Sequence, residues 1–197
     1  MTPLRPASVV TLGLLCLGGC FGSPAKEEFF YFLSGPTGLI DKGTGPRLAV
    51  ADFVVAPGYD TAKLAYRTNA NELRYYQSRQ WISEPGRMIT DLVIRHLRAT
   101  RRFAEVGPAE KVRDPQALLD GTVEALEEVD HETSWYGRLA MTLRLRGEEK
   151  EQVLLRHAFD QQRRCVRRHP VEVARTASEI LEEELRRLAP RLAHAVH

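Results

Sequence analysis

Three segments in the second half of the chain alternate between inward-facing and polar side chains. The inward positions are Leu119, Gly121, Val123 and Ala125 in the first segment, Leu139, Met141, Leu143 and Leu145 in the second, and Val153, Leu155, His157 and Phe159 in the third. Residues two apart lie on the same face of a strand, so each segment predicts a β-strand with one buried face. Because the segments follow one another closely, with a turn beginning at Gly147, they predict an antiparallel meander of three long strands.

Two other segments carry apolar residues at helical spacing. The apolar positions are Met88, Ile89, Leu92, Val93, His96 and Leu97 in one, and Val173, Ala174, Ala177, Ile180, Leu181, Leu185 and Leu188 in the other. We expect Ser83 to cap the first helix, Pro85 to lie in its first turn, and the helix to run to about Arg102. Pro170 opens the second helix, and Pro190 is expected to bend or end it.

The first half of the chain predicts shorter strands. Residues 29–33 are rich in aromatic side chains and predict a strand buried on both faces. Residues 47–55 predict a second strand with a bulge, and residues 63–68 and 72–81 predict a hairpin around an Asn-Ala-Asn turn. We therefore expect an α/β fold: one domain with a mixed, largely antiparallel sheet and two amphipathic helices, packed on one face or one on each.

Composition agrees with one folded domain and does not by itself favour any class of partner. The 197 residues are 43% hydrophobic and 27% charged, which suits a compact domain rather than a disordered chain. Lys and Arg number 28 against 26 Asp and Glu, so net charge gives no general argument for nucleic acid or an acidic substrate.

The N-terminus has the layout of a secretory signal peptide. Arg5 is the one charge before an apolar run over residues 9–17, and this run is shorter than the roughly 20 residues that cross a bilayer. The sequence Leu17-Gly18-Gly19-Cys20 that follows resembles a bacterial lipobox, which implies cleavage before Cys20. We expect residues 1–19 to be the signal peptide and residues 20–27 the lipidated N-terminus and tether, followed by a domain over residues 28–197.

The resemblance to a lipobox gives Cys20 one role and leaves the other cysteines without partners. It implies that the sulfur of Cys20 carries a diacylglycerol and that its amino group is acylated, for instance with palmitate; a plain signal peptide with a coincidental cysteine is the alternative. Phe21, where an aspartate would favour the inner membrane, favours the outer membrane. Cys16 is lost with the signal peptide, and Cys165, which cannot form an internal disulfide alone, is expected to be buried.

No enzymatic motif is present in the sequence. A nucleophile elbow, a phosphate-binding loop, a dinucleotide fingerprint, a zincin motif and a CxxC pair are all missing. The acidic cluster around His131 ("EEVDHET") could hold a divalent metal, but a solvated strand end is favoured. The segment "RYYQSRQW" could stack bases, although strand packing is favoured. We predict no catalytic residues, no metal site, no cofactor besides the covalent lipid and no nucleic-acid partner.

One contiguous block, residues 48–97, resembles the ABC-type transport auxiliary lipoprotein family. The family pattern has a hydrophobic strand, a Pro-x-Tyr turn, a strand ending in Arg, and a strand ending in Trp followed by a small residue, Glu, Pro and a helix. The matching positions are Pro57, Tyr59, Arg67, Trp81, Ser83, Glu84 and Pro85. Asp60 replaces the leucine that usually follows the tyrosine.

The resemblance implies a non-enzymatic accessory lipoprotein. Its expected partners are an MCE-domain protein and an ABC permease that move lipids or other hydrophobic substrates between the membranes, and some members of the family form homo-oligomeric rings. The implied location is the periplasmic face of the outer membrane. The alternative is an outer-membrane assembly or structural lipoprotein that binds a β-barrel or the cell wall.

Three aromatic side chains are our candidates for partner contacts. They are Tyr75, Tyr76 and Trp81, because aromatic residues dominate binding hot spots. For Trp81, a structural role at the corner between strand and helix is favoured over direct contact.

Overall fold

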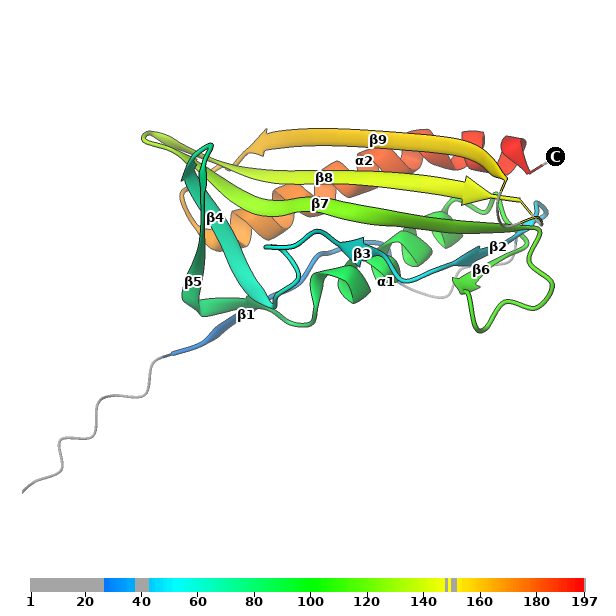
Figure 1. Cartoon of the computed structure of the whole chain (residues 1–197), viewed down its shortest axis with the longest axis horizontal. Coiled ribbons are helices and arrows are strands. Elements are labelled where there is room, and N and C mark those ends of the chain that lie inside the picture. Colours follow the sequence, from blue (N-terminus) through cyan, green and yellow to red (C-terminus); the bar gives the residue numbers. More distant parts are fainter. Residues whose placement is uncertain (1–26, 38–42, 148, 150–151, 197) are drawn as a thin grey trace, which may run out of the picture.

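The longest strand, β7 (Ala117–His131), is a central strand of the sheet, with other strands paired along both of its edges (Figure 1). The structure, a computed structural model, describes residues 27–37, 43–147, 149 and 152–196. One edge of β7 pairs antiparallel with β8 (Ser134–Arg146), which pairs antiparallel with β9 (Val153–Arg164). The predicted meander is therefore confirmed, and its first strand is longer than expected because β7 continues to His131. The prediction that Val153 faces inward is wrong: the register between β8 and β9 shifts beside it, and it is 47% exposed.

Three short strands share the other edge of β7, one after another. They are β2 (Arg47–Val50), β3 (Val54–Val55) and β4 (Lys63–Asn69), and each runs parallel to β7. The single strand predicted over residues 47–55 is thus divided in two, because the chain leaves the sheet between β2 and β3. Phe53 in this break is buried in the core.

The remaining strands extend the sheet outward. β4 forms the predicted hairpin with β5 (Glu72–Trp81), β5 pairs parallel with β1 (Phe29–Tyr31), and β6 (Glu105–Pro108) pairs parallel with β2. The described residues form one mixed sheet of nine strands with two helices, a single α/β domain as predicted.

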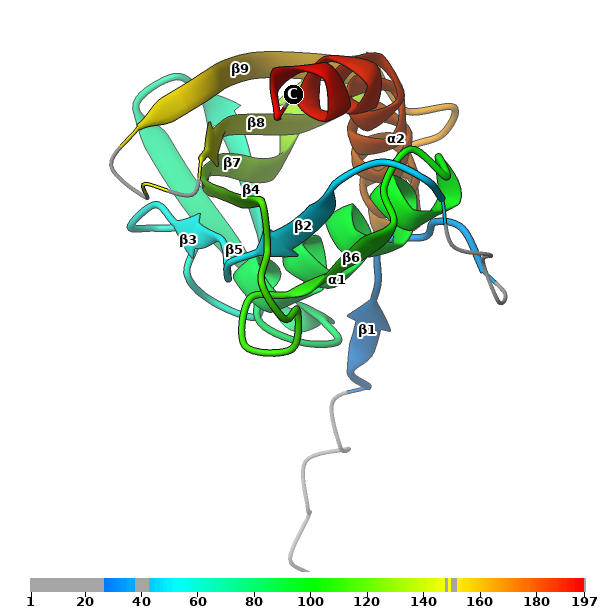
Figure 2. The ribbon, with the colours of Figure 1, turned by 90° about the vertical axis from the view of Figure 1, so that its right-hand side faces the viewer.

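Both helices lie on the same face of the sheet (Figure 2). α1 (Pro85–Ala99) packs near β3 and β6, whereas α2 (Pro170–Ala195) lies against β8 and β9, and the two helices also contact each other. Their apolar stripes and the inward residues of the strands form the main core. Of the two arrangements left open by the sequence, the structure has both helices on one side.

The helix ends differ from the expected ones. α1 has Glu84 at its N-cap position without a side-chain cap, so Ser83 does not have the capping role predicted for it, and the helix ends at Ala99 rather than near Arg102. Pro190 does not end α2, which continues to Ala195. Leu192 beyond the proline is fully buried, so packing of the last turn offsets the missing N–H.

The prediction that strand β1 is buried on both faces is wrong. Tyr31 and Leu33 are buried, but Phe29, Phe30 and Phe32 are exposed. The predicted signal peptide, Cys16, Cys20, Phe21 and the predicted tether up to residue 26 lie outside the described residues. Within the described part, no helix is long and apolar enough to span a membrane.

Candidate functional site

A β-bulge in β7 reverses the alternation of its side chains. Val123 pairs with Met141 and Ala125 with Ala140, so β7 has one extra residue, Glu124, between these pairs. Val123 faces the main core before the bulge, whereas Ala125 packs with a small cluster on the helix-free face after it. The prediction that Ala125 continues the inward face of Val123 is therefore wrong, because the bulge shifts the phase by one residue.

Two consecutive glutamates on β7 lie on opposite faces, and the bulge decides which face each of them has. Glu127 lies opposite Arg138 on the helix-free face, and Glu128 lies opposite Gly137 on the face of the helices. The two side chains are 0% and 1% exposed. The interpretation of the acidic cluster as a solvated strand end is therefore wrong for both of them, although His131 and Glu132 at the strand end are exposed.

Glu127 is the centre of a polar cluster, the Glu127 clamp, formed by Tyr59, Arg67, Glu127, Arg138 and Asp160. Tyr59 Oη and Arg67 Nε donate to Glu127 Oε2 over 2.8 and 2.7 Å, and Arg138 Nη1 donates to Oε1 over 2.8 Å. Arg67 Nη2 also donates to Tyr59 Oη over 2.6 Å. The clamp joins a loop, β4, β7 and β8 through one carboxylate.

Asp160 of β9 completes the clamp. Arg138 donates from Nε and Nη2 to its two carboxylate oxygens, over 2.8 and 2.7 Å. The hydrogen bonds from Arg138 hold the pKa of Asp160 below its usual value. Two arginines therefore balance two carboxylates, and both oxygens of Glu127 receive charged donors, which compensates for its removal from water.

Tyr59 and Glu127, at the centre of the clamp, are both engaged in hydrogen bonds within it. Burial, together with the hydrogen bond to Glu127, raises the pKa of Tyr59 to about 12, so its hydroxyl stays protonated at neutral pH. Glu127 has no free oxygen directed at a cavity, since each one accepts a hydrogen bond from within the clamp. The arrangement fits a rigid support for a surface rather than an acid–base pair.

Tyr75 ties the same loop down from the neighbouring strand. Its hydroxyl donates to the carbonyl of Gly58 over 2.7 Å, and Gly58 has a φ of +93°, a conformation that favours glycine in this turn. Tyr75 keeps 39% of its surface exposed. Among the three predicted contact residues, it has the ring most accessible to a partner on the helix-free face.

Tyr76, the next residue, points to the opposite face. Its hydroxyl lies 3.1 and 3.0 Å from the two carboxylate oxygens of Glu128, and its ring centroid lies 4.7 Å from that of Tyr66, with the two rings tilted by 40°. Burial raises the pKa of Glu128 to about 7, with the hydrogen bond from Tyr76 opposing this effect. Tyr76 is therefore engaged within the protein, half-buried beside a carboxyl that titrates near neutral pH.

Trp81 lies in the core at the end of β5. It is 2% exposed, pairs with Tyr31 of β1, and donates its backbone N–H to the carbonyl of Ala62 over 2.6 Å. Three residues separate it from Pro85, where α1 begins. This placement is the one expected of a residue that fixes the corner between strand and helix.

The other candidates have structural surroundings. His157 lies inward, as predicted, with its Nε2 2.8 Å from Glu184 Oε2 of α2. Cys165 is buried, as predicted, and burial raises the pKa of its thiol. No group of three or more His, Cys, Asp or Glu side chains in the described residues could hold a metal ion.

The family model of the ABC-type transport auxiliary lipoprotein component matches residues 33–189. The chain belongs to this family. The match covers β2 to β9, both helices except the end of α2, and the whole Glu127 clamp. It confirms the resemblance that the sequence block predicted, and it identifies the chain as an auxiliary lipoprotein component of ABC-type transport.

Solved structures share the fold at low sequence identity. Protein XCC0632 from Xanthomonas campestris, of family DUF330, has a TM-score of 0.69 and 16% identity over 85% of this chain and 95% of its own. An uncharacterized protein has the same TM-score and 13% identity over 85% and 99%. At such identities these structures show the fold alone. None of the curated proteins is significantly similar to the chain.

Two residues of the family pattern meet in the clamp, which sequence reasoning did not foresee. Tyr59 and Arg67 both bind Glu127, although neither was expected to share a partner. Glu127 and Arg138 were missed as site residues. A signal was present, because Glu127 and Glu128 lie between Leu126 and Val129 in one strand, and acids enclosed by apolar strand residues need buried partners.

Proposed function

We propose that this auxiliary component is anchored by lipid at Cys20 to the periplasmic face of the outer membrane and serves an MCE-type ABC system for lipids or other hydrophobic substrates. The family match over residues 33–189 is the observation that carries the proposal. The lipobox-like sequence before Cys20 supports the anchor, and Phe21 supports the outer membrane. The protein has no catalytic step in this role; it receives or docks the MCE component.

The helix-free face near Tyr75 is the surface that we propose for this docking. Tyr75 is partly exposed and its position is fixed through Gly58, while the Glu127 clamp holds the same loop from the other side. A rigid aromatic ring loses little conformational entropy on binding. Trp81 and Tyr76 then contribute by fixing the strands beneath this surface, because both are engaged within the domain.

Capture from crosslinked membranes tests the proposal. The tagged full-length protein is expected to recover an MCE-domain protein and an ABC permease. Tyr75→Ala is expected to reduce recovery, whereas Val171→Ala, which changes an exposed apolar residue on α2, is not. Recovery of β-barrels or cell-wall components instead would favour the assembly or structural role. Formation of a homo-oligomeric ring stays a separate prediction, which the mass of the purified protein in solution checks.

A further inference from the structure

Four exposed apolar side chains gather where β1 runs beside the end of β5. Phe29, Phe30, Phe32 and Ile82 are 42%, 52%, 67% and 60% exposed. We call this group the aromatic patch. Large apolar side chains exposed singly are ordinary, but several side by side indicate a surface that contacts another apolar phase.

The strand register brings these residues together. Phe30 lies beside Gln80, and Ile82 N–H donates to the carbonyl of Tyr31 over 2.7 Å, so the same parallel register brings Phe32 beside Ile82. Tyr31 and Trp81, which alternate with Phe30, Phe32 and Ile82, are buried on the other face. Phe29 has the same strand parity as Tyr31 and is exposed at the first residue of β1. β1 and the end of β5 therefore have one face in the core and one face of exposed apolar side chains.

On strand β8, by contrast, the outward-facing surface is mostly polar. Its outward positions include Arg138, Thr142, Arg144 and Arg146, and acids on β7 or β9 pair with them. Ordinary solvation would place such residues on β1 as well. The outward phenylalanines of β1 therefore need an explanation that is specific to this end of the molecule.

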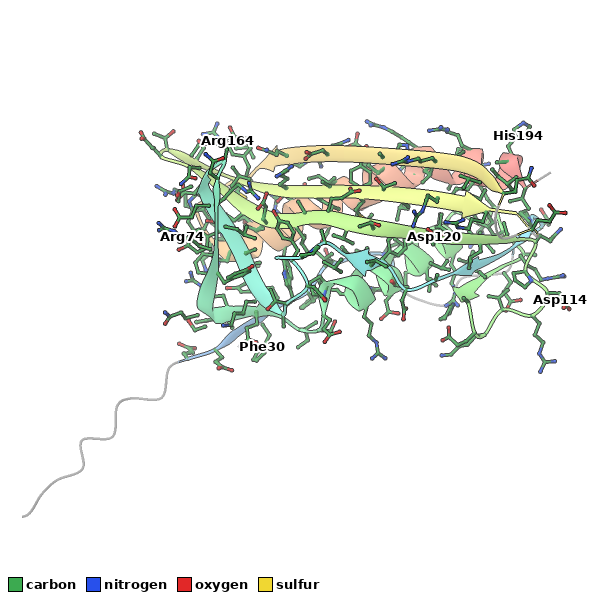
Figure 3. The ribbon with its side chains drawn as sticks, in the orientation of Figure 1. Phe30, Arg74, Asp114, Asp120, Arg164 and His194 are labelled. Carbon is green, nitrogen blue, oxygen red and sulfur yellow. The ribbon has the colours of Figure 1, made fainter. Side chains whose placement is uncertain are left out.

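The position of the aromatic patch along the chain explains why these phenylalanines are exposed. Phe29 is nine residues after Cys20, and nine extended residues span at most roughly 30 Å. If Cys20 carries the lipid, the patch lies within this distance of the bilayer surface at all times. Figure 3 shows Phe30 at the end of the molecule where the described chain begins, far from Asp114 and His194.

We propose that the aromatic patch inserts into the interface of the bilayer that holds the lipid anchor. This inference rests on the proposed anchor at Cys20. Aromatic rings partition well into the headgroup region, and an apolar contact close to a covalent anchor strengthens attachment without needing a large surface. The patch thereby sets the orientation of the domain, with β1 and the end of β5 toward the lipid and the end that carries Asp114 and His194 away from it.

Depth-dependent quenching tests the contact on the full-length, lipidated protein. A tryptophan replaces Phe32 in one variant, and in the matched control it replaces Val153, an exposed apolar residue at the start of β9 at the opposite end (Figure 1). Trp81 and Trp135 are present in both variants and give the same background. Each protein is reconstituted into phosphatidylethanolamine and phosphatidylglycerol vesicles with or without brominated acyl chains.

The proposal expects the emission added by Phe32→Trp to be blue-shifted and largely lost in brominated vesicles, with no such loss for Val153→Trp. If the protein fails to float with the vesicles, the anchor at Cys20 is wrong, and the patch proposal fails with it. If it floats but brominated lipid quenches neither reporter, the patch proposal alone is overturned. Shielding of Phe32→Trp from iodide without quenching by lipid would assign the patch to contact between protein molecules, which also overturns the proposal.

Discussion

Two adjacent residues, Glu127 and Glu128, show how strongly the surroundings decide what a side chain does. Both are fully buried carboxyls on β7. Glu127 accepts hydrogen bonds from two arginines, whereas the hydrogen-bond donor to Glu128 among the described residues is the hydroxyl of Tyr76. The first is stabilised as an anion, and the second loses much of its hydration with little return.

Glu127→Ala is expected to lower the free energy of unfolding by roughly 3 kcal/mol, because it leaves Arg67 and Arg138 without their shared partner. Denaturation by urea measures the change. Glu132→Ala, at an exposed position of the same acidic segment, is the control and should change stability by less than about 0.5 kcal/mol. Equal effects of the two substitutions would show that the clamp does not stabilise the fold.

Glu128 makes stability depend on pH near neutrality. Its folded-state pKa of about 7 lies above the unfolded value, so the folded protein binds more protons than the unfolded chain between these two values. Stability should therefore fall as pH rises through this window and be lowest above pH 7, by up to roughly 3 kcal/mol relative to acid conditions. Glu128→Gln removes this dependence.

Unfolding by urea at pH 5 and pH 8 tests this prediction. The loss of stability between these two pH values should be larger in the wild type than in Glu128→Gln, while the exposed control Glu110→Gln should behave like the wild type. The same pH dependence in wild type and Glu128→Gln would rule out Glu128 as its source.

Among the strands, a single β-bulge explains why the side-chain faces predicted for β7 from its apolar alternation differ from those in the structure. Before Glu124 the predicted faces of β7 are correct; after it every side chain is on the other face. The inward residues of β8 were predicted correctly along the whole segment from Leu139 to Leu145. Apolar alternation predicts a strand, but it does not show where an extra residue interrupts the ladder.

The contact between β8 and α2 gives a testable prediction. A Cβ atom at Gly137 would overlap Thr176 Oγ1 and lie 3.0 Å from the carbonyl oxygen of Val173, both on α2. Gly137→Ala should therefore push the helix from the strand and lower the free energy of unfolding by roughly 2 kcal/mol. Gly147→Ala, whose new atom would lie at least 3.5 Å from its nearest neighbours, should be close to neutral.

Chemical denaturation of both glycine variants decides between these expectations. A destabilised Gly147→Ala with an unaffected Gly137→Ala would contradict the packing seen between β8 and α2.

For the whole molecule, the two faces of the sheet differ in what covers them. Both helices cover one face and close the core, which leaves the other face to the Glu127 clamp, Tyr75 and rows of ion pairs (Figure 2). The chain enters this domain at the exposed aromatic patch. A membrane anchor and a docking surface can therefore occupy different parts of one small domain.

Loss of the proposed lipid anchor should change where the protein is found in the cell but not the stability of its folded domain. Cys20→Ser is expected to move the protein from the membrane fraction to the soluble periplasmic fraction, because the proposed covalent lipid would supply most of the attachment. Its unfolding free energy should stay within about 0.5 kcal/mol of the wild-type domain, since every residue of the main core follows residue 30. Fractionation followed by denaturation measures both properties, and a variant that remains in the membrane would refute lipidation at Cys20.

The three-strand meander, the two amphipathic helices, the α/β class and the family could be predicted from the sequence, because periodicity and an ordered set of motif residues are local properties that a chain displays before it folds. Which face the helices cover, the partner Glu127 that Tyr59 and Arg67 share, and the exposure of the phenylalanines of β1 became visible in the folded structure alone. These outcomes depend on registers and bulges between segments distant along the chain, where a shift of one residue exchanges the two faces of a strand.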